Sequence, residues 1–157
     1  DRVAHTTRLH STMAAALDAM TTLAHRVPET TSSQVWRLVA GGQAQVSVSG
    51  GVKVARAAQK TDAEQSLKAL VLKRTAAANL KPELEIFADD VKCAHGCTVG
   101  ELDKAALFYL QSRGIPRAEA EALLTRAFVA DALAVLPEGE LADALNAETR
   151  AWLEARA

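Results

Sequence analysis

The stretch "GGQAQVSVSGGVKVAR", residues 41–56, carries the clearest secondary-structure pattern in the chain. From Ala44 to Ser49, the apolar residues Ala, Val and Val alternate with Gln, Ser and Ser. A period of two is typical of a β-strand with one buried face, because successive side chains of a strand point to opposite sides. The glycine pairs 41–42 and 50–51 predict a turn on either side of this strand.

Other segments before residue 102 have the same character. Short strands are predicted at "SQVWRLV", "VKVAR", "QSLKALVL", "ELEIF" and "CTVGEL". The hairpin signals Asn-Gly and Asp-Gly are absent, which favours stacked parallel strands over a sandwich. We therefore predict that residues 1–102 form part of a right-handed parallel β-helix. Residues 61–74 are ambiguous, because their composition and the spacing of their leucines also suit a helix.

Beyond residue 102 the spacing of the apolar residues becomes that of an α-helix. Asp103 suits an N-cap and Gly114 a C-terminal stop, so the first helix is predicted between them. A second helix is predicted over 115–136, with Pro116 in its first turn, and a third over 140–155. The fold class is thus mainly β followed by α, with a small helical domain at 103–157.

Composition limits the classes of function. Hydrophobic residues make up 49% of the 157 residues and charged residues 24%, as in ordinary globular proteins. A net charge of −1 gives no case for binding nucleic acid, and no apolar run is long enough to cross a membrane. Two cysteines are too few for a disulfide framework, so we expect a cytoplasmic protein. Because the chain begins at Asp1, in mid-pattern, we expect a fragment of a longer protein.

The segment "ADDVKCAHG", residues 88–96, contains the best candidates for chemistry. Cys93 and His95 are two residues apart, so in a strand both side chains face the same side. Thiolate and imidazole suit iron and iron–sulfur clusters, but a cluster normally needs four ligands. The remaining ligands would come from a partner. Cys97 is interpreted as a small buried residue in the next strand, and Asp89 and Asp90 as turn residues.

This segment, together with "HRVPETTSSQVWRLVAGGQ" upstream, resembles the SufB/SufD family of iron–sulfur cluster assembly proteins, and its SufD branch in particular. The resemblance covers roughly residues 20–135. It implies a β-helix core, C-terminal helices, and a scaffold subunit rather than an enzyme. It also implies that His25, in the first motif, has a structural role.

The resemblance further implies partners and cargo. SufB would form a heterodimer with this chain, and the ATPase SufC would dock on the C-terminal helices. Cys93 and His95 would bind a nascent iron–sulfur cluster shared with the partner subunit, with none expected on the isolated chain. Flavin binding by the full complex is left open. For SufC docking we predict residues on the first two helices: Leu107, Tyr109, Arg113, Leu124 and Phe128.

Two other functions are kept as alternatives. The chain could be a purely structural subunit that binds no metal. It could also be an acyltransferase-like enzyme on a β-helix with His95 as base, although the hexapeptide repeat of such enzymes is not seen. An exposed strand edge also makes a homodimer an option in the absence of SufB.

Overall fold

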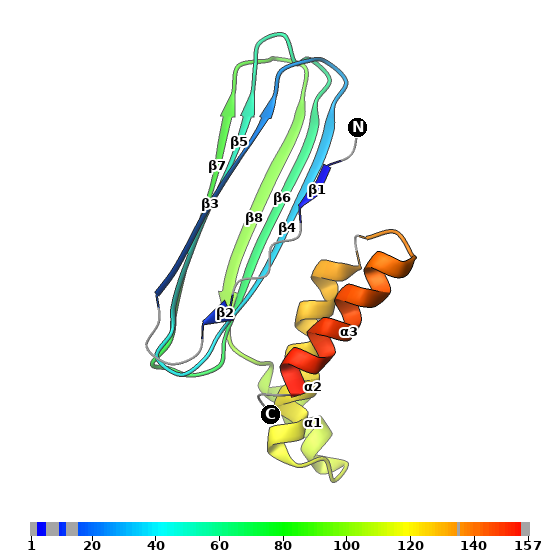
Figure 1. The fold of residues 1–157 in the computed structure, drawn as a ribbon. Helices are drawn as coiled ribbons and strands as arrows, with labels where there is room; N and C mark the ends of the chain where they lie inside the picture. The colour runs from blue at the N-terminus through cyan, green and yellow to red at the C-terminus, as the bar shows by residue number, and fades with distance from the viewer. Residues whose placement is uncertain (1–2, 6–9, 12–15, 135, 155–157) are drawn as a thin grey trace.

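The computed structural model describes residues 3–5, 10–11, 16–134 and 136–154 (Figure 1). Strands come first and helices follow, which confirms the prediction of mainly β followed by α. The strands are β1 (Val3–His5), β2 (His10–Ser11), β3 (Ala16–His25), β4 (Thr31–Ala40), β5 (Gln45–Val54), β6 (Asp62–Val71), β7 (Ala77–Ile86) and β8 (Lys92–Gly100). The helices are α1 (Lys104–Ser112), α2 (Arg117–Leu133) and α3 (Glu140–Glu154).

The long strands alternate between two parallel sheets. The five-stranded sheet has the order β1-β4-β6-β8, with β2 also paired to β4, and the three-stranded sheet has the order β3-β5-β7. From β3 onward each strand therefore pairs with the strand two places along the chain, whereas β1 pairs with β4, and the two sheets face each other as two layers (Figure 1).

The prediction of a right-handed parallel β-helix is wrong. The strands lie in two open sheets, and neither sheet curls or closes on itself. The sequence signals predict parallel pairing, but they carry no information on whether a sheet closes. Several strands are also longer than predicted: β4 to β7 have 10 residues each, as does β3, for which no strand was predicted. Extended chain of that length spans about 33 Å, so these strands make long layers rather than short coil segments.

The core lies between the two sheets. One apolar cluster joins residues of both: Trp36, Leu38, Ala40, Val46, Val48, Leu67 and Ala69. A second cluster consists of Val52, Val54, Ala58, Ala63 and Ala88. The alternation seen at residues 44–49 is confirmed, because Val46 and Val48 are buried between the sheets.

The two glycine pairs have different roles. Gly42, with a φ of 60°, lies in the turn between β4 and β5, as predicted. Gly50 and Gly51 instead lie inside β5, so the second predicted turn is wrong. A Cβ on Gly50 would lie 2.3 Å from Nε2 of Gln65, so a side chain from the opposite sheet fills the space beside this glycine.

The ambiguous segment 61–74 forms strand β6 over Asp62–Val71. Its residues pair with β4 on one side and with β8 on the other. Backbone pairing on both edges, together with burial of Leu67 in the core, outweighs the helical propensity of its composition.

The helices follow directly after β8, and a salt bridge connects α2 to the five-stranded sheet. Asp103 caps α1, its Oδ1 accepting hydrogen bonds from the backbone N–H groups of Ala105 and Ala106 at 2.8 and 3.3 Å. Gly114 follows α1 with a φ of 84°, as expected of its predicted role. Arg37 on β4 forms a salt bridge of 2.6 Å with Asp131 on α2. No helix in the described ranges is long and apolar enough to cross a membrane.

His25 is a buried structural residue at the end of β3, as predicted. Its Nδ1 is hydrogen-bonded to Thr30 at 2.7 Å and its Nε2 to Ser32 at 2.9 Å. Burial lowers the pKa of His25 below its ordinary value of 6.5. The two hydroxyls therefore hold a neutral imidazole at this corner.

This burial predicts a pH-dependent stability. Between the folded and unfolded pKa values of His25, the unfolded chain binds more protons than the folded chain. The free energy of unfolding should therefore fall as the pH drops through about 6.5 and level off below the folded pKa. Urea denaturation between pH 7.5 and 5 measures this, and His25→Gln should give a flatter profile. An equally steep fall in His25→Gln would assign the effect to other groups.

Candidate functional site on strand β8

Strand β8 is at the edge of the five-stranded sheet. It pairs with β6, and no other described strand lies on its far side. Most of its residues are exposed, from Ala94 to Val99. The edge strand of the other sheet, β7, lies next to β8 at the same end of the two-layer structure. Unpaired backbone groups along such an edge are available to a partner chain.

Cys93 and His95 project from the same face of β8. Cys93 is in register with Ala63 of β6, and His95 with Gln65. Ala63 and Gln65 both face the space between the sheets, so the two candidate ligands face that space too. The structure thus brings together the two residues that were predicted to act as a pair.

Cys97 belongs to the same strand and the same face. It is in register with the buried Leu67, and its own side chain is exposed. The interpretation of Cys97 as a buried residue of the next strand is therefore wrong. The signal for its placement was in the sequence: Cys93, His95 and Cys97 keep a period of two, and Gly96 did not interrupt the strand.

The three donors do not form a complete site on their own. Residues four apart in a strand are separated by about 13 Å, so Cys93 and Cys97 cannot bind one ion together. Among the residues that the structure describes, no three His, Cys, Asp or Glu side chains are grouped to hold a metal. His95 can share an ion with one cysteine, which leaves ligand positions for other chains.

Cys93 and His95 have different surroundings. Cys93 is half-buried beside the second apolar cluster, and burial raises the pKa of its thiol. A backbone hydrogen bond with Ala63 acts in the opposite direction, and the nearby Asp62 carboxylate raises this pKa further. His95 is exposed, so its imidazole is accessible from solvent. The thiol therefore needs either a metal or a base to become a good ligand at neutral pH.

This difference predicts unequal reactivity of the two free cysteines. Cys97 is exposed and should be alkylated by iodoacetamide at pH 7.5 well before Cys93, whose raised pKa lowers its thiolate fraction. The rate at Cys93 should keep rising at a pH where an ordinary thiol has levelled off. Peptide mass spectrometry of a time course measures both rates, with Cys97→Ser as the control. Faster labelling of Cys93 would contradict the placement of the two side chains.

A polar layer lies at the level of His95, between the two apolar clusters. Gln34 and Gln65 are both buried, and Gln65 Nε2 donates to Gln34 Oε1 over 2.7 Å. Oε1 of Gln65 has no hydrogen-bond partner among the described residues. Sequence reasoning missed this layer, since two glutamines 31 residues apart give no local signal.

Asp89 and Asp90 lie in the turn before β8, as predicted. The backbone N–H of Asp90 donates to Oε1 of Gln59 at 2.9 Å, and the Asp90 carbonyl accepts from the Lys60 backbone. Both side chains are exposed. These contacts fix the start of β8 and therefore the direction in which Cys93 and His95 project.

The residues predicted to bind an ATPase lie on α1, at its C-cap and on α2. Tyr109 and Arg113 are brought together, with the guanidinium carbon 5.0 Å from the ring centroid, and Tyr109 is 56% exposed. Leu107, Leu124 and Phe128 are half-buried. The sequence reasoning missed Phe108, which is 73% exposed beside Tyr109. Its signal was an aromatic residue lying off the apolar stripe of that helix.

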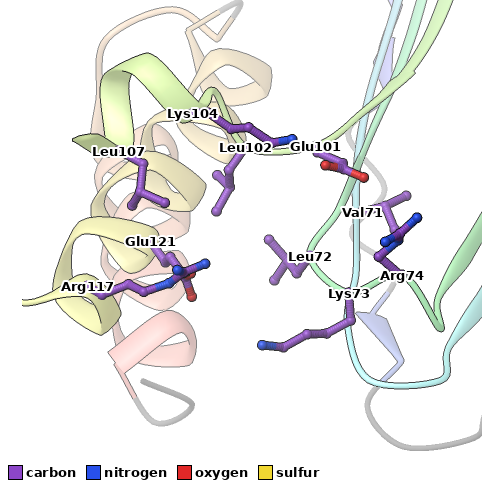
Figure 2. A pocket seen from close by; sticks show the side chains of 10 residues that line it. All are labelled: Val71, Leu72, Lys73, Arg74, Glu101, Leu102, Lys104, Leu107, Arg117 and Glu121. Carbon is purple, nitrogen blue, oxygen red and sulfur yellow. The ribbon is translucent and has the colours of Figure 1, made fainter. Parts of the chain in front are cut away.

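A hollow lies between the helices and the end of β6. Figure 2 shows Leu72, Leu102 and Leu107 inside it, with charged residues around them. These charged residues are Lys73, Arg74, Glu101, Lys104, Arg117 and Glu121. Arg117 and Glu121 already pair with each other at 2.8 Å. Leu107 lines this hollow from the helix side, whereas the exposed Tyr109 and Arg113 are not part of its lining.

Comparison with known proteins gives a consistent family. Residues 5–128 match the model of the SufBD core domain of the SUF system for iron–sulfur cluster assembly. The chain is 40% identical over 124 residues to an iron–sulfur cluster assembly SufBD family protein of Synechocystis. It is 38% identical over 114 residues to the iron–sulfur cluster assembly protein SufD of Escherichia coli, and 41% over 106 residues to the chloroplastic protein ABCI7 of Arabidopsis thaliana.

These matches cover much of this chain but little of the relatives. The first two cover 79% and 73% of this chain, and each covers 27% of the relative. The Arabidopsis match covers 68% of this chain and 22% of the relative. The chain thus spans about a quarter of the length of these relatives. The family-model match includes β8, α1 and the first part of α2. The chain belongs to the SufBD family of iron–sulfur cluster assembly proteins.

Proposed function

We propose that this chain is part of a SufD-type scaffold subunit, which pairs with SufB, docks the ATPase SufC and contributes ligands to a nascent iron–sulfur cluster. The observation that carries the proposal is the placement of Cys93 and His95 on one face of an edge strand. The cluster is the cargo of such a complex rather than a resident group of this chain. The subunit itself is not an enzyme in this proposal.

The chemistry of the donors supports cargo of this kind. A thiolate and an imidazole are both known ligands of iron–sulfur clusters. One strand supplies two adjacent donors, and the other coordination positions stay open for SufB. The exposed edge of β8 offers backbone N–H and C=O groups for pairing with a strand of SufB. An edge strand that carries the donors would bring the ligands of both subunits to one interface.

The helices supply the docking surface for SufC. Phe108 and Tyr109 are exposed on α1 and Arg113 is exposed at its C-cap, and aromatic and arginine side chains are enriched at protein interfaces. Arg37 holds α2 to β4, so movement of the docked ATPase would act on the five-stranded sheet that also contains β8. The two free cysteines suit a reducing compartment, and we propose the cytoplasm.

Reconstitution with SufB and SufC tests the ligand role. Complexes that contain His95→Ala or Cys93→Ala should assemble but should form much less cluster, measured as bound iron and acid-labile sulfide. Thr98→Ala is the matched control, because Thr98 lies on the same strand but on the opposite face. A normal cluster yield in the His95→Ala/Cys93→Ala double variant would instead support a purely structural subunit.

A further inference from the structure

The buried amide pair beside β8 has one unused acceptor. Gln65 is 3% exposed, and its Nε2 already donates to Gln34. Its Oε1 is buried without a donor among the described residues. Buried polar atoms in folded proteins nearly always have a partner, so an unpaired acceptor in a core calls for an explanation.

The neighbours of the Gln34–Gln65 pair limit which residue can donate a hydrogen bond to Oε1 of Gln65. Gln34 on β4 takes the amide N–H on one side, and Gly50 of the opposite sheet leaves only enough room for the amide itself. On the other side of Gln65, the residue in register is His95 on β8. In the structure the exposed His95 ring makes no hydrogen bond to Gln65, but neighbouring strands are about 4.8 Å apart, so rotation of the His95 side chain brings a ring N–H within reach of Oε1. An imidazole N–H is the kind of donor that Oε1 lacks.

We propose that Gln65 is a positioning residue for His95. When the His95 side chain rotates inward, this unpaired Oε1 accepts a hydrogen bond from one ring N–H, which selects one tautomer and leaves the other ring nitrogen free to bind iron. A histidine that binds a metal usually donates its second ring N–H to such an acceptor. The inference rests on the proposed function, since it assigns a role to Gln65 through the ligand role of His95.

The test uses the intact subunit with its histidine rings labelled with nitrogen-15. Ring nitrogen shifts report the tautomer of His95, and a His95→Asn sample assigns its signals. In the wild-type protein one tautomer should dominate, and in Gln65→Met the two should be mixed. Gln34→Met is the matched control, because it breaks the same amide pair but leaves Oε1 of Gln65 in place. Gln65→Glu keeps an acceptor oxygen and should keep the single tautomer.

Cluster yield in the complex with SufB and SufC gives a second readout. Gln65→Met should lower the yield about tenfold, as is typical when a residue that orients a metal-binding histidine is lost. If Gln65→Met alone fails to fold, the Gln34→Met/Gln65→Met double variant removes both amides together and still lacks the acceptor.

The outcomes distinguish the positioning role of Gln65 from the ligand role of His95. Unchanged His95 ring shifts in Gln65→Met, with a cluster yield that still depends on His95, would overturn the role of Gln65 alone. A normal cluster yield in His95→Asn would overturn the proposed ligand role, and the positioning role with it. Mixed tautomers in Gln65→Met, with a single tautomer in Gln34→Met, would support the inference.

Discussion

Gly50→Val should lower the free energy of unfolding by about 3 kcal/mol or more. A Cβ at this position would lie 2.3 Å from Nε2 and 3.2 Å from the amide carbon of Gln65. The amide would have to move, and its hydrogen bond to Gln34 would break in a buried layer. Overpacking and the loss of a buried hydrogen bond each cost about 1–3 kcal/mol, and both apply here. Urea denaturation measures the loss.

Gly51→Val is the matched control for this substitution. Gly51 is the next residue of the same strand, but its added Cβ would meet only atoms of Thr21 and Thr22 at 3.5 Å or more. Those are ordinary van der Waals distances, and valine favours a strand. Gly51→Val should therefore leave the stability almost unchanged. Equal losses in the two variants would show that β5 itself, and not the contact with Gln65, requires glycine.

Arg37→Ala should cost about 3 kcal/mol, because it removes a buried guanidinium and leaves several of its acceptors on β4 and β6 unpaired. The Arg37 side chain is 6% exposed, while that of Asp131 is 54% exposed. The guanidinium also donates to the Trp36 carbonyl at 2.8 Å and to Ser66 at 3.2 Å. Its removal would leave these acceptors unpaired under α2 and would loosen the contact between the helix and the five-stranded sheet. Chemical denaturation measures the loss, and hydrogen exchange of α2 measures the loosening.

Arg117→Ala provides the comparison. Arg117 also forms an ion pair, with Glu121 at 2.8 Å on the same helix, but its side chain is 70% exposed. Exposed pairs four residues apart on a helix are worth about 0.3–0.5 kcal/mol. A similar loss from Arg37→Ala and Arg117→Ala would mean that the contact between α2 and β4 contributes little. It would then be a poor route for transmitting ATPase movement to the sheet.

Local patterns predicted much of the fold, and long-range contacts account for what they missed. The alternation at residues 44–49 and the cap at Asp103 depend on near neighbours, and both predictions are confirmed. The turn predicted at Gly50 failed because the reason for that glycine is Gln65, which lies on the other sheet. The strand at 61–74 was ambiguous because its pairing partners are about 30 residues away on both sides. Whether a sheet closes on itself leaves no pattern in the local sequence, so this could not be predicted.

At the candidate site, too, features that depend on near neighbours could be predicted, and features that depend on distant residues could not. The spacing of Cys93 and His95 was enough to place them on one face, and the structure brings them together there. Cys97 was misplaced because the strand was expected to end before it, although the period of two continues. The burial of Gln34 and Gln65 depends on the second sheet, so no reading of the sequence around His95 could have found Gln65 beside it.

The most direct test of the central claim is pulsed electron paramagnetic resonance of a reduced cluster in the reconstituted complex. Only this subunit would carry histidine labelled with nitrogen-15, and SufB and SufC would be unlabelled. We predict a nitrogen-15 coupling to the cluster that is absent from a complex made with His95→Asn and retained with Thr98→Ala. A fully formed cluster without nitrogen-15 coupling in the labelled wild-type complex would contradict the claim that His95 is one of its ligands.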